Sequence, residues 1–162
     1  MANQKKAQVM SQVFIFILAA AIFILILTYG YKAIAGFGQR SEQVALVEFQ
    51  TELEGAVKSI SLDYGSVKKV ELTLPTKYTE LCFVDLEREP SEEFEQIHPR
   101  MYESWVSRTQ NVFLTPMEES PINVGKIYVG QSGYLCLPIA GGKITLRLEG
   151  LGDRAGITQW QQ

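Results

Sequence analysis

The stretch KKAQVMSQVFIFILAAAIFILIL, Lys5 to Leu27, places two lysines and a short polar run directly before an apolar block. No charged residue occurs from Val13 to Tyr31. As a helix this charge-free stretch is about 28 Å long at about 1.5 Å per residue, close to the hydrocarbon thickness of a bilayer. The sequence therefore predicts one membrane-spanning helix, with the lipid bilayer as its first partner.

An ordinary secretory signal is the main competing interpretation of this segment. Such signals have an apolar region of about 7–15 residues that ends in a small-residue cleavage site. The small residues Ala19, Ala20 and Ala21 lie inside the apolar run, so cleavage there would leave an apolar new terminus. We therefore expect the helix to stay in the mature protein. The positive charges on the two flanks differ little, with Lys5, Lys6 and the amino terminus on one side and Lys32 and Arg40 on the other, and we expect the larger C-terminal part to be extracytoplasmic.

A second helical pattern follows the apolar block. Apolar residues recur at steps of three and four from Leu46 through Phe49, Leu53 and Val57 to Ile60, and the charged residues of this stretch fall between them. This spacing predicts an amphipathic helix. We expect a transmembrane half at 8–35 and an amphipathic half at 36–62, with a bend permitted near Gly36. Core packing against the following domain and a contact between subunits both explain the apolar stripe.

Residues 63–162 change to a period of two, which is typical of strands. VKKVELTL and ELCFVDLE are interpreted as a strand pair, NVFLTP as an additional strand, and GKIYVG, GYLCLPIA and KITLRLEG as an antiparallel meander with glycine turns. The acidic stretch at about 87–100 is expected to be an exposed loop with one helical turn, and Gly150 to Gln162 a loosely held tail. The predicted fold class is α+β: a long N-terminal helix followed by a small antiparallel β-sheet domain.

The chain has two cysteines, Cys82 and Cys136, each inside an apolar predicted strand. On an extracytoplasmic face they can pair and join the first hairpin to the last, adding about 4 kcal/mol in the chain-entropy model. Two buried free thiols are the alternative.

Composition and motifs argue against other classes of function. A net charge of −3 and a pI of about 5.3 exclude a broad basic surface, so nucleic acid is not an expected partner. The single histidine, His98, has no Cys or His at metal-ligand spacing in the sequence and is expected to be a solvated loop residue. Nucleophile, phosphate-loop and calcium-loop patterns are absent, so we expect no enzyme activity, cofactor or metal site.

The segment before the apolar block resembles the class III signal of type IV pilin-like proteins, particularly the archaeal ones. Lys5 and Lys6 stand where that family has a basic pair, Ala7 where it has a small residue before the cut, and Gln8 where a mature archaeal pilin often begins. The resemblance implies that residues 1–7 are a leader removed by a prepilin peptidase. It also implies a long helix followed by a β domain. Gln12 stands where bacterial pilins usually have glutamate, which favours the archaeal branch.

Two functional hypotheses follow. The first is a structural subunit of a pilus-like surface filament, or a pseudopilin, whose helix packs against identical copies or other pilins after leaving the membrane. The helix residues expected to make these contacts are Phe14, Phe16, Ala19, Ala20, Ala21, Phe23 and Leu27. The second is a permanently anchored single-pass surface protein whose β domain binds a partner through exposed aromatics, for which Tyr102, Trp105 and Trp160 are the candidates.

Overall fold

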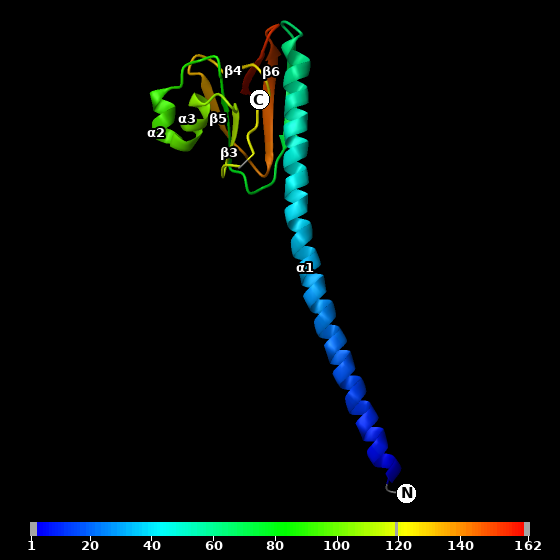
Figure 1. Ribbon diagram of the computed structural model, residues 1–162. Helices are drawn as coiled ribbons and strands as arrows, with labels where there is room; N and C mark the ends of the chain where they lie inside the picture. The colour runs from blue at the N-terminus through cyan, green and yellow to red at the C-terminus, as the bar shows by residue number, and fades with distance from the viewer. Residues whose placement is uncertain (1–2, 119, 161–162) are drawn as a thin grey trace. The chain divides into compact units, whose positions relative to one another are not determined.

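The computed structural model describes residues 3–118 and 120–160 of the chain (Figure 1). The chain divides into two units, an N-terminal unit of residues 1–43 and a C-terminal unit of residues 44–162. The elements in chain order are α1 (Asn3–Ser61), β1 (Val67–Thr73), β2 (Glu80–Val84), α2 (Glu92–Ile97), α3 (Pro99–Val106), β3 (Val112–Thr115), β4 (Ile127–Tyr128), β5 (Tyr134–Pro138), β6 (Lys143–Gly150) and β7 (Ala155–Gln159). The fold class is α+β, as the sequence predicts.

The N-terminal unit consists of the first part of α1. The helix begins at Asn3 and passes through the glycines at 36 and 38 without ending. Thr28 donates its hydroxyl to the carbonyl oxygen of Ile24 at 2.7 Å, so this polar side chain is satisfied within the helix.

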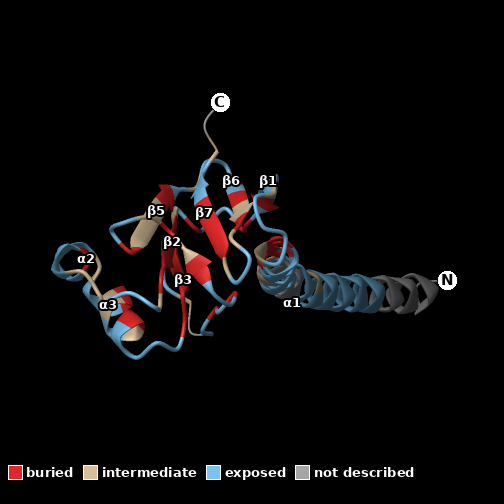
Figure 2. Cartoon of the chain, turned by 90° about the horizontal axis from the view of Figure 1, so that it is seen from above, coloured by how far each residue is buried: buried red, intermediate tan, exposed pale blue. Residues whose placement is uncertain are grey.

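The last turns of α1 belong to the C-terminal unit and supply one wall of its core. Phe49, Leu53, Val57 and Ile60 are between 0% and 4% exposed, and they pack with residues of both sheets. The apolar stripe thus packs against the following domain, as its spacing predicts. Figure 2 shows buried positions in red on α1 as well as on the strands.

In the described part of the chain, seven strands form two sheets. The four-stranded sheet has the order β1-β6-β7-β4, and the three-stranded sheet has the order β3-β2-β5. In β1 exposed and buried residues alternate, because one face of its sheet packs on the core and the other faces solvent. In β2 four consecutive residues are buried. Its side chains alternate between the core shared with α1 and a second cluster under α2 and α3.

The expected pairing of β1 with β2 is wrong. β1 pairs antiparallel with β6 along its full length, from Val67 opposite Glu149 to Thr73 opposite Lys143. β2 instead lies between β3 and β5 in the other sheet. The connection through Pro75 passes from one sheet to the other. β2 is the central strand of its sheet because both of its edges are paired, and both of its faces also have apolar partners.

The predicted meander of the last strands is also wrong. β5 belongs to the three-stranded sheet, β6 to the four-stranded sheet, and β4 pairs with β7 in parallel. The glycines between β5 and β6 do have the expected positive φ, 60° at Gly141 and 72° at Gly142. Their turn connects the two sheets. It also passes close to the backbone that follows β1, because an added Cβ at Gly142 would meet the carbonyl oxygen of Leu74 at 2.6 Å.

The C-terminal segment is not a loose tail. β7 lies inside the four-stranded sheet between β6 and β4, and its residues Ala155 and Ile157 are fully buried. β3 forms where NVFLTP predicts it.

The acidic segment at 87–100 is only partly an exposed loop. The expected helical turn is present as α2, but Phe94 on it is fully buried and packs edge-on against Trp105, with the ring centroids 5.4 Å apart. Trp105 is itself fully buried, which corrects its assignment as an exposed contact. Phe94 on α2 and Met101 and Trp105 on α3 are buried in the apolar cluster beneath the two helices and hold them on the three-stranded sheet.

Candidate functional site

The most exposed apolar surface of the described chain is the part of α1 from Val13 to Ile34. This segment of 22 residues has a mean hydropathy of 2.8, none of its most apolar window is buried, and it is long enough to cross a membrane. The predicted contact residues lie on it with exposed side chains: Phe14 66%, Phe16 73%, Phe23 62%, Leu27 57%, and Ala19, Ala20 and Ala21, also exposed. An apolar helix surface of this size needs a non-aqueous partner, either lipid or other protein.

The apolar surface has a polar-aromatic end. Tyr29 and Tyr31 are 72% and 77% exposed. Aromatic rings that carry a hydroxyl favour the headgroup level of a bilayer, and Lys32 follows them. These residues mark the C-terminal end of the apolar surface.

The three residues of the predicted processing site, Lys6, Ala7 and Gln8, lie within the helical backbone of α1. Their side chains fall outside the described part of the structure, and so does the expected leader start at residues 1–2. Processing at this bond stays a prediction.

The two cysteines form a disulfide between neighbouring strands of the three-stranded sheet. Cys82 on β2 and Cys136 on β5 are direct register partners, with Cα atoms 4.0 Å apart. The bond therefore does not join a first hairpin to a last one, as the sequence suggested. It crosslinks segments 54 residues apart in the chain.

His98 is not a solvated loop residue. Its side chain is 18% exposed, and its ring lies against Phe94 with the centroids 5.2 Å apart. Its Nε2 atom is 3.8 Å from Cys136 Sγ and 3.8 Å from a carboxylate oxygen of Glu80. The sequence did not predict that His98, Cys136 and Glu80 lie close together, because the register of β2 and β5 brings together residues that are far apart in the chain. The one local signal was Glu80 and Cys82 two positions apart, on one face of a strand.

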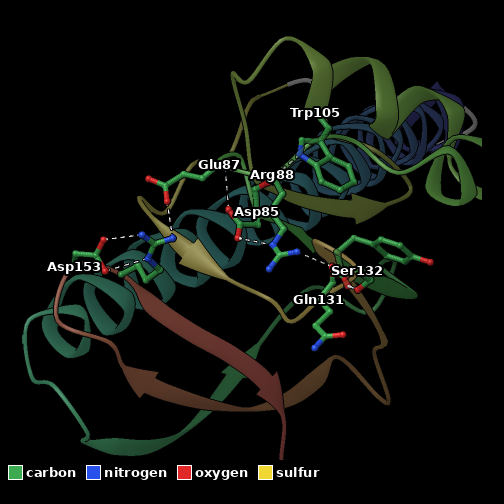
Figure 3. Close-up of polar contacts among 9 residues, drawn as sticks. Asp85, Glu87, Arg88, Trp105, Gln131, Ser132 and Asp153 are labelled. Atoms are coloured by element: carbon green, nitrogen blue, oxygen red, sulfur yellow. Dashed lines mark hydrogen bonds and ion pairs between the residues drawn. The ribbon is translucent and has the colours of Figure 1, made fainter.

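A polar network fixes the segment that leaves β2 (Figure 3). Asp85 is 2% exposed, its carboxylate accepts the backbone N–H of Glu87 at 2.9 Å, and its carbonyl oxygen accepts the indole N–H of Trp105 at 3.1 Å. Arg88 donates to the carbonyl oxygen of Gln131 at 2.9 Å. The network ties α3 and the loop before β5 to the end of β2.

A charged cluster continues this network on the surface. Arg154 and Lys126 both contact the carboxylate of Glu87, at 2.6 Å and 2.8 Å. The hydrogen bond from Lys126 lowers the pKa of Glu87, and the hydrogen bond from Arg154 lowers the pKa of Asp153. Both carboxylates are already paired with basic side chains. We therefore interpret the cluster as a structural link between the segment after β2 and the start of β7.

Replacing Asp85 with Ala is expected to destabilise the C-terminal unit by about 2 kcal/mol. The substitution removes the acceptor of the Glu87 N–H from a buried position. Chemical unfolding of the full chain in detergent, followed by the fluorescence of buried Trp105, measures this change.

The matched control is Asp153→Ala, because Asp153 is 58% exposed and contacts Arg154 at the surface. It should leave the unfolding midpoint unchanged. Equal midpoints for the two variants would show that the network around Asp85 does not hold the segment.

Within the described residues, every buried side-chain nitrogen or oxygen has a hydrogen-bond partner. No family model, curated protein or solved structure matches the chain.

Proposed function

We propose that the chain is a structural subunit of a type IV pilus-like surface filament, or a pseudopilin, held in the membrane by α1 before assembly. The observation that carries the proposal is the combination of two surfaces on one helix. Residues 13–34 of α1 are apolar and unburied, while Phe49, Leu53 and Val57 of the same helix are core residues of the C-terminal unit.

This combination suits a subunit that transmits force. A tether of any sequence can hold a domain near a membrane, but here the helix that carries the apolar surface is also part of the domain core. Tension on the helix is therefore carried by its side chains that are packed in the domain core. A filament whose helices form its central core needs this kind of connection.

The apolar segment can exchange lipid for protein neighbours. No charged residue occurs between Val13 and Tyr31, so packing copies of this segment together buries no charge. Ala19, Ala20 and Ala21 permit close approach of helix backbones, and the phenylalanines supply large side chains to fill the spaces between them. The signal-like residues Lys6, Ala7 and Gln8 add support from the sequence.

The alternative is a permanently anchored surface protein with a binding domain. Of its three candidate aromatic contacts, Trp105 is fully buried and Tyr102 and Trp160 are half-buried. The two proposals place the C-terminal unit on the same side of the membrane. They differ in the fate of residues 1–7 and in whether copies assemble.

We expect the protein isolated from its native host to begin at Gln8. A peptidase that cuts between Ala7 and Gln8 removes the leader and leaves the apolar helix as the new N-terminus. N-terminal sequencing of surface material, supported by intact mass, measures this directly.

A variant and its control sharpen the result. Ala7→Phe replaces the small residue beside the bond and should leave the leader attached, whereas Ala2→Phe, far from the bond, should be processed normally. Assembled native material that still begins at Met1 or Ala2 would contradict the filament proposal and favour the anchored protein.

A further inference from the structure

We propose that, when its disulfide is reduced, the C-terminal unit binds a divalent transition-metal cation of the zinc class through Cys82, Cys136, His98 and Glu80. This inference concerns only the C-terminal unit and does not depend on the filament proposal. Among the described residues, these four form a group whose ligand atoms all lie within 4.8 Å of one another.

The backbone positions three of the ligands. Cys82 and Cys136 face each other across β2 and β5, and Glu80 precedes Cys82 by two residues, so its side chain leaves the same face of the sheet. The fourth ligand, His98, stands between α2 and α3, which cover this face. Phe94 is fully buried and its ring lies against His98, which fixes the imidazole over the sheet.

The distances suit a tetrahedral ion. His98 Nε2 lies 3.8 Å from Cys136 Sγ and 3.8 Å from Glu80 Oε2. In a tetrahedral zinc site with bonds of about 2.0 Å to nitrogen and oxygen and about 2.3 Å to sulfur, neighbouring ligand atoms are roughly 3.3–3.5 Å apart. Two edges of the tetrahedron are therefore within about 0.5 Å of the required length before any side chain moves.

The ligand set selects the class of metal. Two thiolates and one imidazole are soft or borderline ligands that favour zinc-class cations over calcium or magnesium. Thr115 lies 3.4 Å from Glu80 Oε2 through its hydroxyl, which helps to orient the carboxylate. Cys82 is fully buried, while Glu80 is 32% exposed on its side chain, so a cation can enter from the Glu80 side.

The disulfide and the metal exclude each other. A dithiol reductant opens the Cys82–Cys136 bond: its own two thiols become a disulfide, and the two cysteines become thiols. A divalent cation then replaces the two thiol protons, which leave to solvent, and forms two metal–thiolate bonds. In both states β2 and β5 stay crosslinked at the same register position, so the metal maintains the sheet in the reduced chain.

Cobalt titration of the full-length chain in detergent tests the proposal, with a phosphine as reductant. The reduced protein should bind one Co²⁺ per chain and show both a thiolate-to-cobalt charge-transfer band and the d–d bands of a tetrahedral ion, and Zn²⁺ should displace them. The oxidised protein should show neither band.

Variants assign the ligands. His98→Ala and, as a milder change, His98→Gln should each weaken Co²⁺ binding by at least about tenfold. Glu80→Gln should weaken it as well, and the matched control Glu89→Gln, at an exposed position of the same charge, should leave the affinity unchanged. Trp105 fluorescence shows whether each variant is folded.

Three results would overturn the inference. They are reduced protein without a charge-transfer band, a Cys82→Ser/Cys136→Ser double variant with wild-type affinity for Co²⁺, and folded histidine variants with unchanged affinity.

Discussion

Ala20→Asp is expected to reduce the amount of chain in the membrane and to abolish high-molecular-weight assemblies. Ala20 is exposed near the middle of the apolar segment Val13–Ile34. An aspartate at the centre of a membrane-spanning helix costs about 2.5–3.5 kcal/mol, which corresponds to roughly a 100-fold shift in insertion. Membrane fractionation and the yield of sheared, sedimentable filaments measure the two effects.

The control makes the same substitution at another depth. Ala33 lies next to the end of the segment and beside Lys32, so an aspartate there reaches headgroup water. Ala33→Asp should remain in the membrane at close to the normal level. If both variants lose insertion equally, depth in the membrane is not the cause of the effect.

A third variant separates assembly from anchoring. Ala20→Leu keeps the segment apolar and should leave membrane insertion unchanged. It adds bulk where small residues permit close helix approach, so we expect the filament yield to fall. A simple anchor has no reason to respond to this change, and normal assembly of Ala20→Leu would argue against helix packing at Ala19 to Ala21.

Local patterns predicted the elements of this fold better than its pairings. The apolar run has the length of a membrane-spanning helix, the stripe from Phe49 to Ile60 follows helix spacing, and both lie on α1. The sequence also predicted the strand at 80–84, but it did not predict the place of this strand in the sheet. Its four consecutive buried residues are typical of a strand covered on both faces, and that pattern was the available sign that β2 is central and not part of a hairpin with β1.

The errors have a common physical cause. Strand pairing depends on partners far apart in sequence, and the spacing of turn residues says little about which sheet each strand joins. β7 was missed because AGITQ is short and contains a glycine, yet it is held by pairing on both edges. The Cys82, Cys136, His98 and Glu80 group escaped sequence reasoning for the same reason, since the β2–β5 register and the packing of α2 and α3 on that sheet assemble it.

Gly150→Ala is expected to destabilise the C-terminal unit by about 3 kcal/mol. Gly150 ends β6, and its backbone bonds to the turn after α1: its N–H donates to Ser66 at 2.9 Å and its carbonyl accepts from Gly65 at 2.8 Å. An added Cβ would clash with the carbonyl oxygens of Ile60 and Asp63. These are backbone atoms, so relief requires moving the end of α1 away from the sheet.

Gly55 supplies the matched control within the same unit. It lies on an exposed position inside α1, and an added Cβ there meets nothing within 4 Å. Since glycine in a helix interior costs about 0.5–1 kcal/mol relative to alanine, Gly55→Ala should stabilise the protein by about that amount. The midpoint of chemical unfolding, followed by Trp105 fluorescence, should therefore fall for Gly150→Ala and rise for Gly55→Ala. Because Gly150 permits the close approach of the helix end to the four-stranded sheet, equal stability of Gly150→Ala and wild type would mean that the end of α1 is not held at this point. The attachment of the helix would then rest on the core packing of Phe49, Leu53 and Val57.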